Sequence, residues 1–189
     1  MIFKHTSIEG AFVVALDPRR DERGSFARAF CKREFEAQGI QFNVAQANLA
    51  QTNHAGVIRG LHYQVAPDEE QKFVRCISGA VHDVIVDMRS TSESYRRVLQ
   101  IRLDSRERLA LFIPSGVAHG YQVLADHTEF LYLTDQFYSP GIEKGVRYDD
   151  PAIAVSWPLP PRDITERDQH WPLLQWPLPQ SGAGARDGK

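Results

Sequence analysis

Short segments of alternating apolar and polar residues, each bounded by turn residues, recur through most of the chain. Because side chains along a β-strand point to opposite faces in turn, this pattern predicts strands with one buried face. About ten are expected, divided by Gly, Pro, Asp, Asn or Ser: residues 13–16, 25–30, 42–47, 56–64, 72–77, 80–88, 98–103, 109–113, 118–123 and 129–134. Strands of this number and length predict an all-β barrel or sandwich.

Helical patterns are rare in this chain. Residues 32–38, stopped by Gly39, predict one early helix, and a short helical turn is expected after Thr165. The length of 189 residues favours one domain, which we place at residues 1–175. Residues 176–189 contain Pro, Gly, Ser and Ala without a core pattern and predict a disordered tail.

The segment 81–89 has an unusual distribution of polar residues. Period-two alternation places Asp83, Ile85, Asp87 and Arg89 on one face, which is too polar for an ordinary core. This face is either solvated or lines a wet interior in a barrel large enough to hold a small ligand.

Two other strands carry polar side chains on otherwise apolar faces. Lys72 shares a face with Val74 and Cys76, an unusual place for a solvated lysine. Tyr132 aligns with Phe130, so its ring either packs in the core with a satisfied hydroxyl or projects into a functional compartment.

Composition excludes several classes of partner. With 22 Lys+Arg against 24 Asp+Glu, the net charge of −2 provides no field that would attract nucleic acid or a membrane surface. No segment approaches the roughly 20 apolar residues that span a bilayer, and the N-terminus lacks a signal-peptide pattern, so a soluble cytoplasmic protein is expected. Cys31 and Cys76 form no CxxC pair and are expected to be reduced, buried thiols.

The segment 56–64 and the following strand carry the strongest chemical signal. His62, Arg59 and Lys72 would place a proton-transfer base beside cations suited to an anionic substrate. No Walker loop is present, and no Gly-x-Gly-x-x-Gly follows a strand, so phosphate recognition would use side chains, with Arg23 and Arg75 as further candidates.

A metal site is not expected, although one motif is typical of metal-binding barrels. The Pro-x-Gly-x-x-His spacing that ends at His119 resembles the second half of the cupin signature. The first half of that signature requires His-x-His and a following Glu, but the chain has His62-Tyr63-Gln64. His62 and His119 alone fall short of the three or four ligands that such a metal needs.

An ordered series of motifs resembles the dTDP-4-dehydrorhamnose 3,5-epimerase family over residues 1–175. The motifs are Asp21-x-Arg23-Gly24-x-Phe26, Gln46-x-Asn48, the segment 56–64, 71–76, 79–89, 113–120, 129–132, Tyr138-x-Pro140, 149–151, Trp157-Pro158 and Thr165-x-x-Asp168. The resemblance implies an all-β, cupin-type jelly-roll barrel with a few short helices. It also implies a homodimer that exchanges N-terminal strand structure and epimerises a nucleotide-linked 4-keto-6-deoxyhexose without a metal or organic cofactor.

The resemblance also implies roles for individual residues. The base matches His62, its orienting carboxylate Asp168, the enolate-stabilising lysine Lys72 and the general acid Tyr132. Asp168 could also simply cap a short helix after Thr165. The implied substrate-binding residues are Gln46, Asn48 and Arg59 for the sugar–phosphate end, His119 beside the sugar, Tyr138 for the nucleotide, and Arg23 and Phe26 for the nucleotide from the same or the partner subunit.

Departures from the family pattern fall on the expected nucleotide and sugar rim. Arg28 stands where an acidic residue is frequent, Ala50 where serine is common, and the segment 48–55 is one residue longer than in many relatives. A CDP- or GDP-linked substrate, or inversion of only one carbon, is the alternative within enzymes. A non-catalytic cupin that binds a sugar nucleotide is the alternative of another class, but binding alone does not require both an acid and a base.

Overall fold

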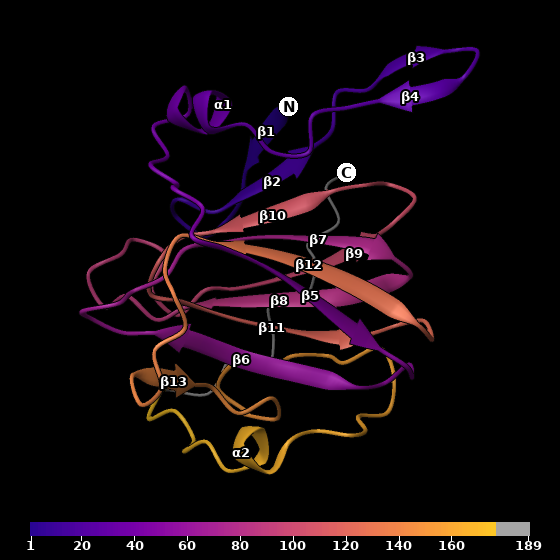
Figure 1. Ribbon diagram of the computed structural model, residues 1–189. Helices are drawn as coiled ribbons and strands as arrows, with labels where there is room; N and C mark the ends of the chain where they lie inside the picture. Colours follow the sequence, from indigo (N-terminus) through magenta and orange to yellow (C-terminus); the bar gives the residue numbers. More distant parts are fainter. Residues whose placement is uncertain (177–189) are drawn as a thin grey trace, which may run out of the picture.

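The computed structural model describes residues 1–176, which are almost entirely β-structure (Figure 1). Two antiparallel sheets face each other, with strand orders β1-β2-β10-β7-β12-β5 and β13-β6-β11-β8-β9, and a separate hairpin joins β3 to β4. The strands are β1 (Ile2–His5), β2 (Phe12–Ala15), β3 (Arg19–Asp21), β4 (Gly24–Phe26), β5 (Gln46–Thr52), β6 (Ile58–Gln64), β7 (Lys72–Ser78), β8 (Ala80–Asp87), β9 (Val98–Asp104), β10 (Ala110–Ile113), β11 (Val117–Val123), β12 (Thr128–Thr134) and β13 (Glu143–Gly145). This is the expected cupin-type jelly roll.

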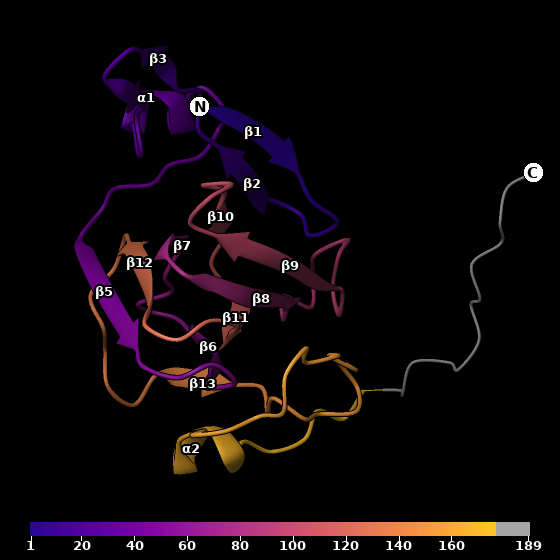
Figure 2. The same ribbon diagram turned by 90° about the vertical axis from the view of Figure 1, so that its right-hand side faces the viewer.

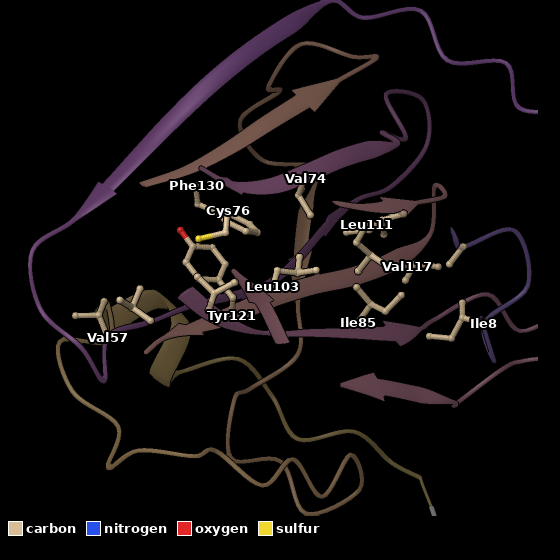
Figure 3. Packing of buried hydrophobic residues seen from close by; sticks show 14 residues of the cluster. Ile8, Val57, Val74, Cys76, Ile85, Leu103, Leu111, Val117, Tyr121 and Phe130 are labelled. Carbon is tan, nitrogen blue, oxygen red and sulfur yellow. The ribbon is translucent and has the colours of Figure 1, made fainter. Parts of the chain in front are cut away.

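The main core lies between the two sheets. Val74 on β7, Ile85 on β8, Leu111 on β10, Tyr121 on β11 and Phe130 on β12 all point into it, as Figure 3 shows. Each fully buried side chain of this size contributes roughly 1.5–3 kcal/mol relative to exposure. The apolar positions of the alternating pattern therefore fix which faces of the sheets meet.

The outer face of the larger sheet is covered near its β1–β2 end by an aromatic cluster beneath α1 (Lys32–Glu36). Phe35 stacks on Phe42 at 5.8 Å between ring centroids and meets the edges of Phe73 and Phe112 at 5.1 and 5.6 Å. The smaller sheet is covered by the C-terminal segment, whose Val146 and Ile153 form part of a second outer cluster. Figures 1 and 2 show α1 and α2 (Glu166–Gln169) at opposite ends of the molecule, with α2 beside β6.

Most predicted elements are confirmed within one or two residues, including both helices. The strand expected at 42–47 is wrong in its first part: it begins at Gln46 and continues to Thr52. Phe42 instead packs against Phe35 under α1, because this burial removes more apolar surface from water than an exposed strand position would. The strand expected at 25–30 ends at Phe26.

Strands β1, β3 and β13 were not predicted, since they span only three or four residues and are mostly exposed or half-buried. Cys31 and Cys76 are free thiols, as expected, although only Cys76 is buried. No helix within residues 1–176 is long and apolar enough to cross a membrane. Of the disordered tail predicted at 176–189, only Trp176 is among the described residues, so the prediction for 177–189 lies outside them.

Candidate active site

His62 lies on β6 between two carboxylates. Its Nε2 is 2.5 Å from Asp168 Oδ1, and its Nδ1 is 3.4 Å from Glu143 Oε1. Burial by itself raises the pKa of Asp168, but the hydrogen bond and charge of His62, together with Thr165 and Arg167, outweigh it and hold this pKa below its ordinary value. Asp168 is therefore an ionised carboxylate that fixes the orientation of the imidazole ring.

The Thr165-x-x-Asp168 motif both caps α2 and positions the Asp168 side chain. Thr165 is the N-cap of α2, and its side-chain oxygen accepts a hydrogen bond from the Asp168 backbone N–H at 3.3 Å. Asp168 is buried, and its carboxylate remains free to reach His62. The capping motif thus places the carboxylate, and the two interpretations of this residue are compatible.

Glu143 is a site residue that the sequence did not reveal. Strand β13 pairs with β6 so that Glu143 is opposite Gln64 and Gly145 is opposite His62. Glu143 also forms an ion pair with Arg167, whose Nε is 3.7 Å from Asp168 Oδ1. The surrounding Gly-Ile-Glu-Lys sequence has no strand pattern, so only the tertiary pairing could have identified this residue.

Lys72 comes from the facing sheet. Its Nζ donates a hydrogen bond to the His62 backbone carbonyl at 3.2 Å and is 2.9 Å from Glu70 Oε1. The side chain is only 13% exposed, on the same face as the buried Val74 and Cys76. The sequence-based expectation that Lys72 is not a solvated lysine is therefore correct.

His119 is the cross-strand partner of His62 in the β6–β11 pair. Its Nε2 is 2.9 Å from Asp83 Oδ2, and both side chains are buried. The face of β8 that carries Asp83 and Asp87 points toward the barrel interior rather than solvent, so its solvated interpretation is wrong. The polar residues of this strand are paired instead: Asp83 with His119, and Asp87 with Arg89, Ser92 and Ser94.

Tyr132 approaches this group from β12, in the other sheet. Its ring centroid is 6.2 Å from that of His119, and its cross-strand partner on β5 is Asn48. Burial, followed by the influence of Tyr121, raises the pKa of Tyr132 well above its ordinary value. The phenol is therefore protonated near neutral pH and can act as a proton donor.

Arg59 faces the same side of β6 as His62, which simple alternation would not allow at a spacing of three residues. The register between β6 and β11 shifts between the His119–His62 pair and the Tyr121–Arg59 pair, and this irregularity turns both side chains inward. A Cβ on Gly60 would lie 2.5 Å from the Gly120 Cα, so the close approach of the two strands requires glycine here. Arg59 Nε is 3.3 Å from Thr52 Oγ1 on β5.

Gln46 and Tyr138 lie at the edge of this group. The Tyr138 backbone N–H donates to Gln46 Oε1 at 3.0 Å, and the Tyr138 ring is exposed. An exposed ring anchored beside the site is suited to stacking on a planar group.

Comparison with known proteins agrees with this geometry. The profile of the family described as dTDP-4-dehydrorhamnose 3,5-epimerase matches residues 5–175. The chain belongs to the dTDP-4-dehydrorhamnose 3,5-epimerase family. An enzyme of that name from Methanothermobacter thermautotrophicus is 36% identical over 180 residues, covering 93% of this chain and 96% of its own length.

Two other relatives place the chain within this epimerase family. A dTDP-4-dehydrorhamnose 3-epimerase from Streptomyces niveus is 36% identical over 175 residues, covering 92% of this chain and 84% of its own. The crystal structure of the Bacillus anthracis 3,5-epimerase, with TDP and PPi bound, has a TM-score of 0.88 at 31% identity and covers 92% of this chain and 99% of that chain. Fold and family are thus established together.

Not every residue implied by the epimerase resemblance joins the site. Arg23 and Phe26 lie on the β3–β4 hairpin, which extends away from the barrel (Figure 1). Arg23 pairs with Asp21 at 2.6 Å, and Phe26 is 78% exposed. Within one chain, Arg23 and Phe26 therefore lie away from His62, because the hairpin leaves the barrel; their contact with the nucleotide, from the same or the partner subunit, stays a prediction. Arg75, a candidate phosphate ligand, is buried on the outer face of β7 and also lies away from the site.

Within residues 1–176, no group of three or more His, Cys, Asp or Glu side chains is arranged to hold a metal ion. His62 and His119 instead each contact a carboxylate. The two histidines are thus oriented by hydrogen bonds rather than combined in one cluster with further ligands.

Proposed function

We propose that this chain catalyses the 3,5-epimerisation of dTDP-4-dehydro-6-deoxyglucose to the corresponding 4-dehydro-rhamnose. The observation that carries the proposal is the placement of a base and an acid on opposite sheets. His62 comes from β6, with Asp168 of α2 hydrogen-bonded to its ring, and Tyr132 comes from β12 in the facing sheet. Inversion of a carbon requires removal of a proton from one side and delivery from the other, which this arrangement supports.

The C4 ketone acidifies the neighbouring C3 and C5 hydrogens. His62 removes the proton, and Asp168 stabilises the resulting imidazolium. Lys72 stabilises the negative charge on the C4 oxygen, because its ammonium group is held near His62 by Glu70 and the His62 carbonyl. Tyr132 then transfers its hydroxyl proton to the opposite side of the planar carbon. Solvent resets both groups before the second carbon reacts.

The substrate-binding roles follow from the positions around this set. Arg59 would bind the diphosphate through its guanidinium fork, with Gln46 and Asn48 beside the sugar–phosphate end. His119 would contact the sugar, and the exposed Tyr138 ring would stack on the base. The TDP and PPi in the Bacillus anthracis relative support a thymidine nucleotide as the substrate's carrier.

We also propose a homodimer in which Arg23 and Phe26 complete the site of the partner subunit. The exposed Phe26 and the projecting hairpin are explained if the hairpin packs on a second copy. An apolar hollow on the outer face of β7 and β12, which includes Ile77, Leu131 and Leu133, provides a surface for such contact. The cytoplasmic location stays a prediction.

Solvent deuterium exchange tests the catalytic proposal. The protein is incubated in D2O with the dTDP-, CDP- and GDP-linked 4-keto sugars, and NMR locates the label and the configuration at C3 and C5. Label with inversion at both carbons of the dTDP sugar is expected. Inversion at C3 alone would indicate an activity like that named for the Streptomyces niveus relative, and binding without label would leave only the non-catalytic alternative.

His62→Ala should reduce exchange by roughly 1,000-fold while retaining nucleotide affinity, since a positioned base contributes about 10²–10⁴-fold. His82→Ala is the matched control, because His82 interacts with Gln100 and Trp157 outside the barrel interior. Equal exchange in both variants would refute the role of His62.

Mixing of two variants tests the shared site. Arg23→Ala and His62→Ala chains are each assayed alone and after co-expression. If Arg23 serves the partner's site, mixed dimers contain one intact site, and activity returns to about a quarter of wild type. No recovery, or a monomer in light scattering, would refute the shared site.

A further inference from the structure

Tyr121 carries a buried hydroxyl that the proposed mechanism does not use. The residue is 2% exposed, and its Oη has no hydrogen-bond partner among residues 1–176. A buried hydroxyl without a partner costs about 1–3 kcal/mol. Phenylalanine would fill the same volume without this cost, so the hydroxyl requires a functional explanation.

The ring of Tyr121 reaches from β11 toward β12, which carries the proposed acid, and toward the neighbouring β7. Figure 3 shows it directed across the interior toward Phe130 and Cys76, and its centroid is 4.6 Å from that of Phe130. The Tyr132 ring is 6.2 Å away. The approach of the two hydroxyls acts to raise the pKa of Tyr132 and to lower that of Tyr121, the direction expected when Tyr132 points its own proton toward Tyr121 before the reaction. The two hydroxyls are therefore neighbours, although the Tyr121 Oη does not meet the geometry of a full hydrogen bond.

The chemistry at Tyr132 creates a need for such a neighbour. When Tyr132 gives its proton to the carbon, its O–H bond breaks, a C–H bond forms, and a phenolate remains in a buried position. Burial disfavours this charge, as the raised pKa of Tyr132 indicates. A hydroxyl that donates to the phenolate oxygen would offset this cost, since hydrogen bonds to charged groups are roughly twice as strong as neutral ones.

We propose that Tyr121 is a positioning residue for the acid: its hydroxyl donates a hydrogen bond to Tyr132 as that phenol loses its proton. The proposal rests on the proposed epimerase function. Asp83 is the cross-strand partner of Tyr121, and its Oδ1 also lacks a hydrogen-bond partner among the described residues. The Asp83 carboxylate forms no hydrogen bond with the Tyr121 hydroxyl but is hydrogen-bonded to His119, whose ring stacks on that of Tyr121 at 6.2 Å between centroids. This stacking along β11 holds the Tyr121 ring in place.

Tyr121→Phe separates proton removal from proton delivery. In D2O, His62 can remove a proton and return a deuteron to the same side, which gives label without inversion. We expect inversion to fall about 10- to 100-fold in Tyr121→Phe, because one hydrogen bond to a charge is lost, while exchange and nucleotide affinity stay within about twofold. Tyr63→Phe, which removes a hydroxyl packed on the outer side of β6, should change neither rate.

Three results would overturn the proposal: unchanged inversion, an equal loss of inversion and exchange, or the same change in Tyr63→Phe. Tyr132→Phe, measured in parallel, distinguishes the two proposals. If Tyr132→Phe abolishes inversion but Tyr121→Phe does not slow it, only the role of Tyr121 fails. If the wild type neither exchanges nor inverts any of the sugars, the proposed function fails and this inference falls with it.

Discussion

Asp87→Asn should destabilise the protein in a pH-dependent manner. The Asp87 side chain is fully buried and accepts hydrogen bonds from Arg89, Ser92 and Ser94, at 2.7, 2.7 and 2.6 Å. Burial alone raises its pKa, but these donors outweigh burial and lower the pKa from 3.8 to about 2. At about 1.36 kcal/mol per pKa unit, the ionised carboxylate contributes about 2.5 kcal/mol to the free energy of unfolding at neutral pH.

The direction of the pH effect follows from the lowered pKa. The contribution is complete above the unfolded-state pKa near 3.8 and disappears as the pH falls through the folded-state value of about 2. The pH-dependent difference between wild type and Asp87→Asn should therefore be largest from pH 5 to 7 and reduced to about half near pH 3. Residual loss at low pH would reflect the weaker acceptor geometry of asparagine.

Urea unfolding at a fixed protein concentration, between pH 3 and 7.5, measures this difference. Asp149→Asn is the control, because its carboxylate pairs with Arg147 at the surface and should contribute less than about 1 kcal/mol. A difference below about 0.5 kcal/mol at pH 7 for Asp87→Asn, or one that does not decrease toward pH 3, would refute the linkage argument.

Two further predictions concern the His62 strand. Asp168→Asn should reduce deuterium exchange by about 10²- to 10⁴-fold because an amide no longer fixes the imidazole or stabilises its charge, and unchanged exchange would refute this role. Gly60→Ala should lower the midpoint of thermal unfolding more than Gly39→Ala does. Gly39 also has a positive φ, but nothing lies within 4 Å of the added Cβ there. Equal shifts of the midpoint in the two variants would contradict the close approach of Gly60 to Gly120.

Some of the site could be predicted because alternation is a local property. Lys72 and Tyr132 lie on strands with clear period-two patterns, and both point inward as their apolar neighbours do. Arg59 and His62 break this rule, since the register shift between β6 and β11 turns both inward. A shift of this kind depends on the partner strand and leaves no alternation signal in the segment itself.

Local alternation also does not identify the two carboxylates that contact His62. Asp168 lies 106 positions after His62, and Glu143 sits in a three-residue strand, yet both contact the histidine ring. In sequence each resembles an ordinary surface acid. The motif resemblance alone pointed to Asp168, and Glu143 is identified only by the pairing of β13 with β6.

The sequence by itself determined the all-β architecture, both short helices and, through its motifs, the expected base, lysine and acid. These follow from local alternation, capping and turn residues, which act over a few positions. The tertiary structure decided that Asp83 is buried against His119, that Glu143 flanks His62, and that Arg23 and Phe26 leave their own barrel. These outcomes depend on which distant surfaces bury each other, a sum over nonlocal contacts that no single segment contains.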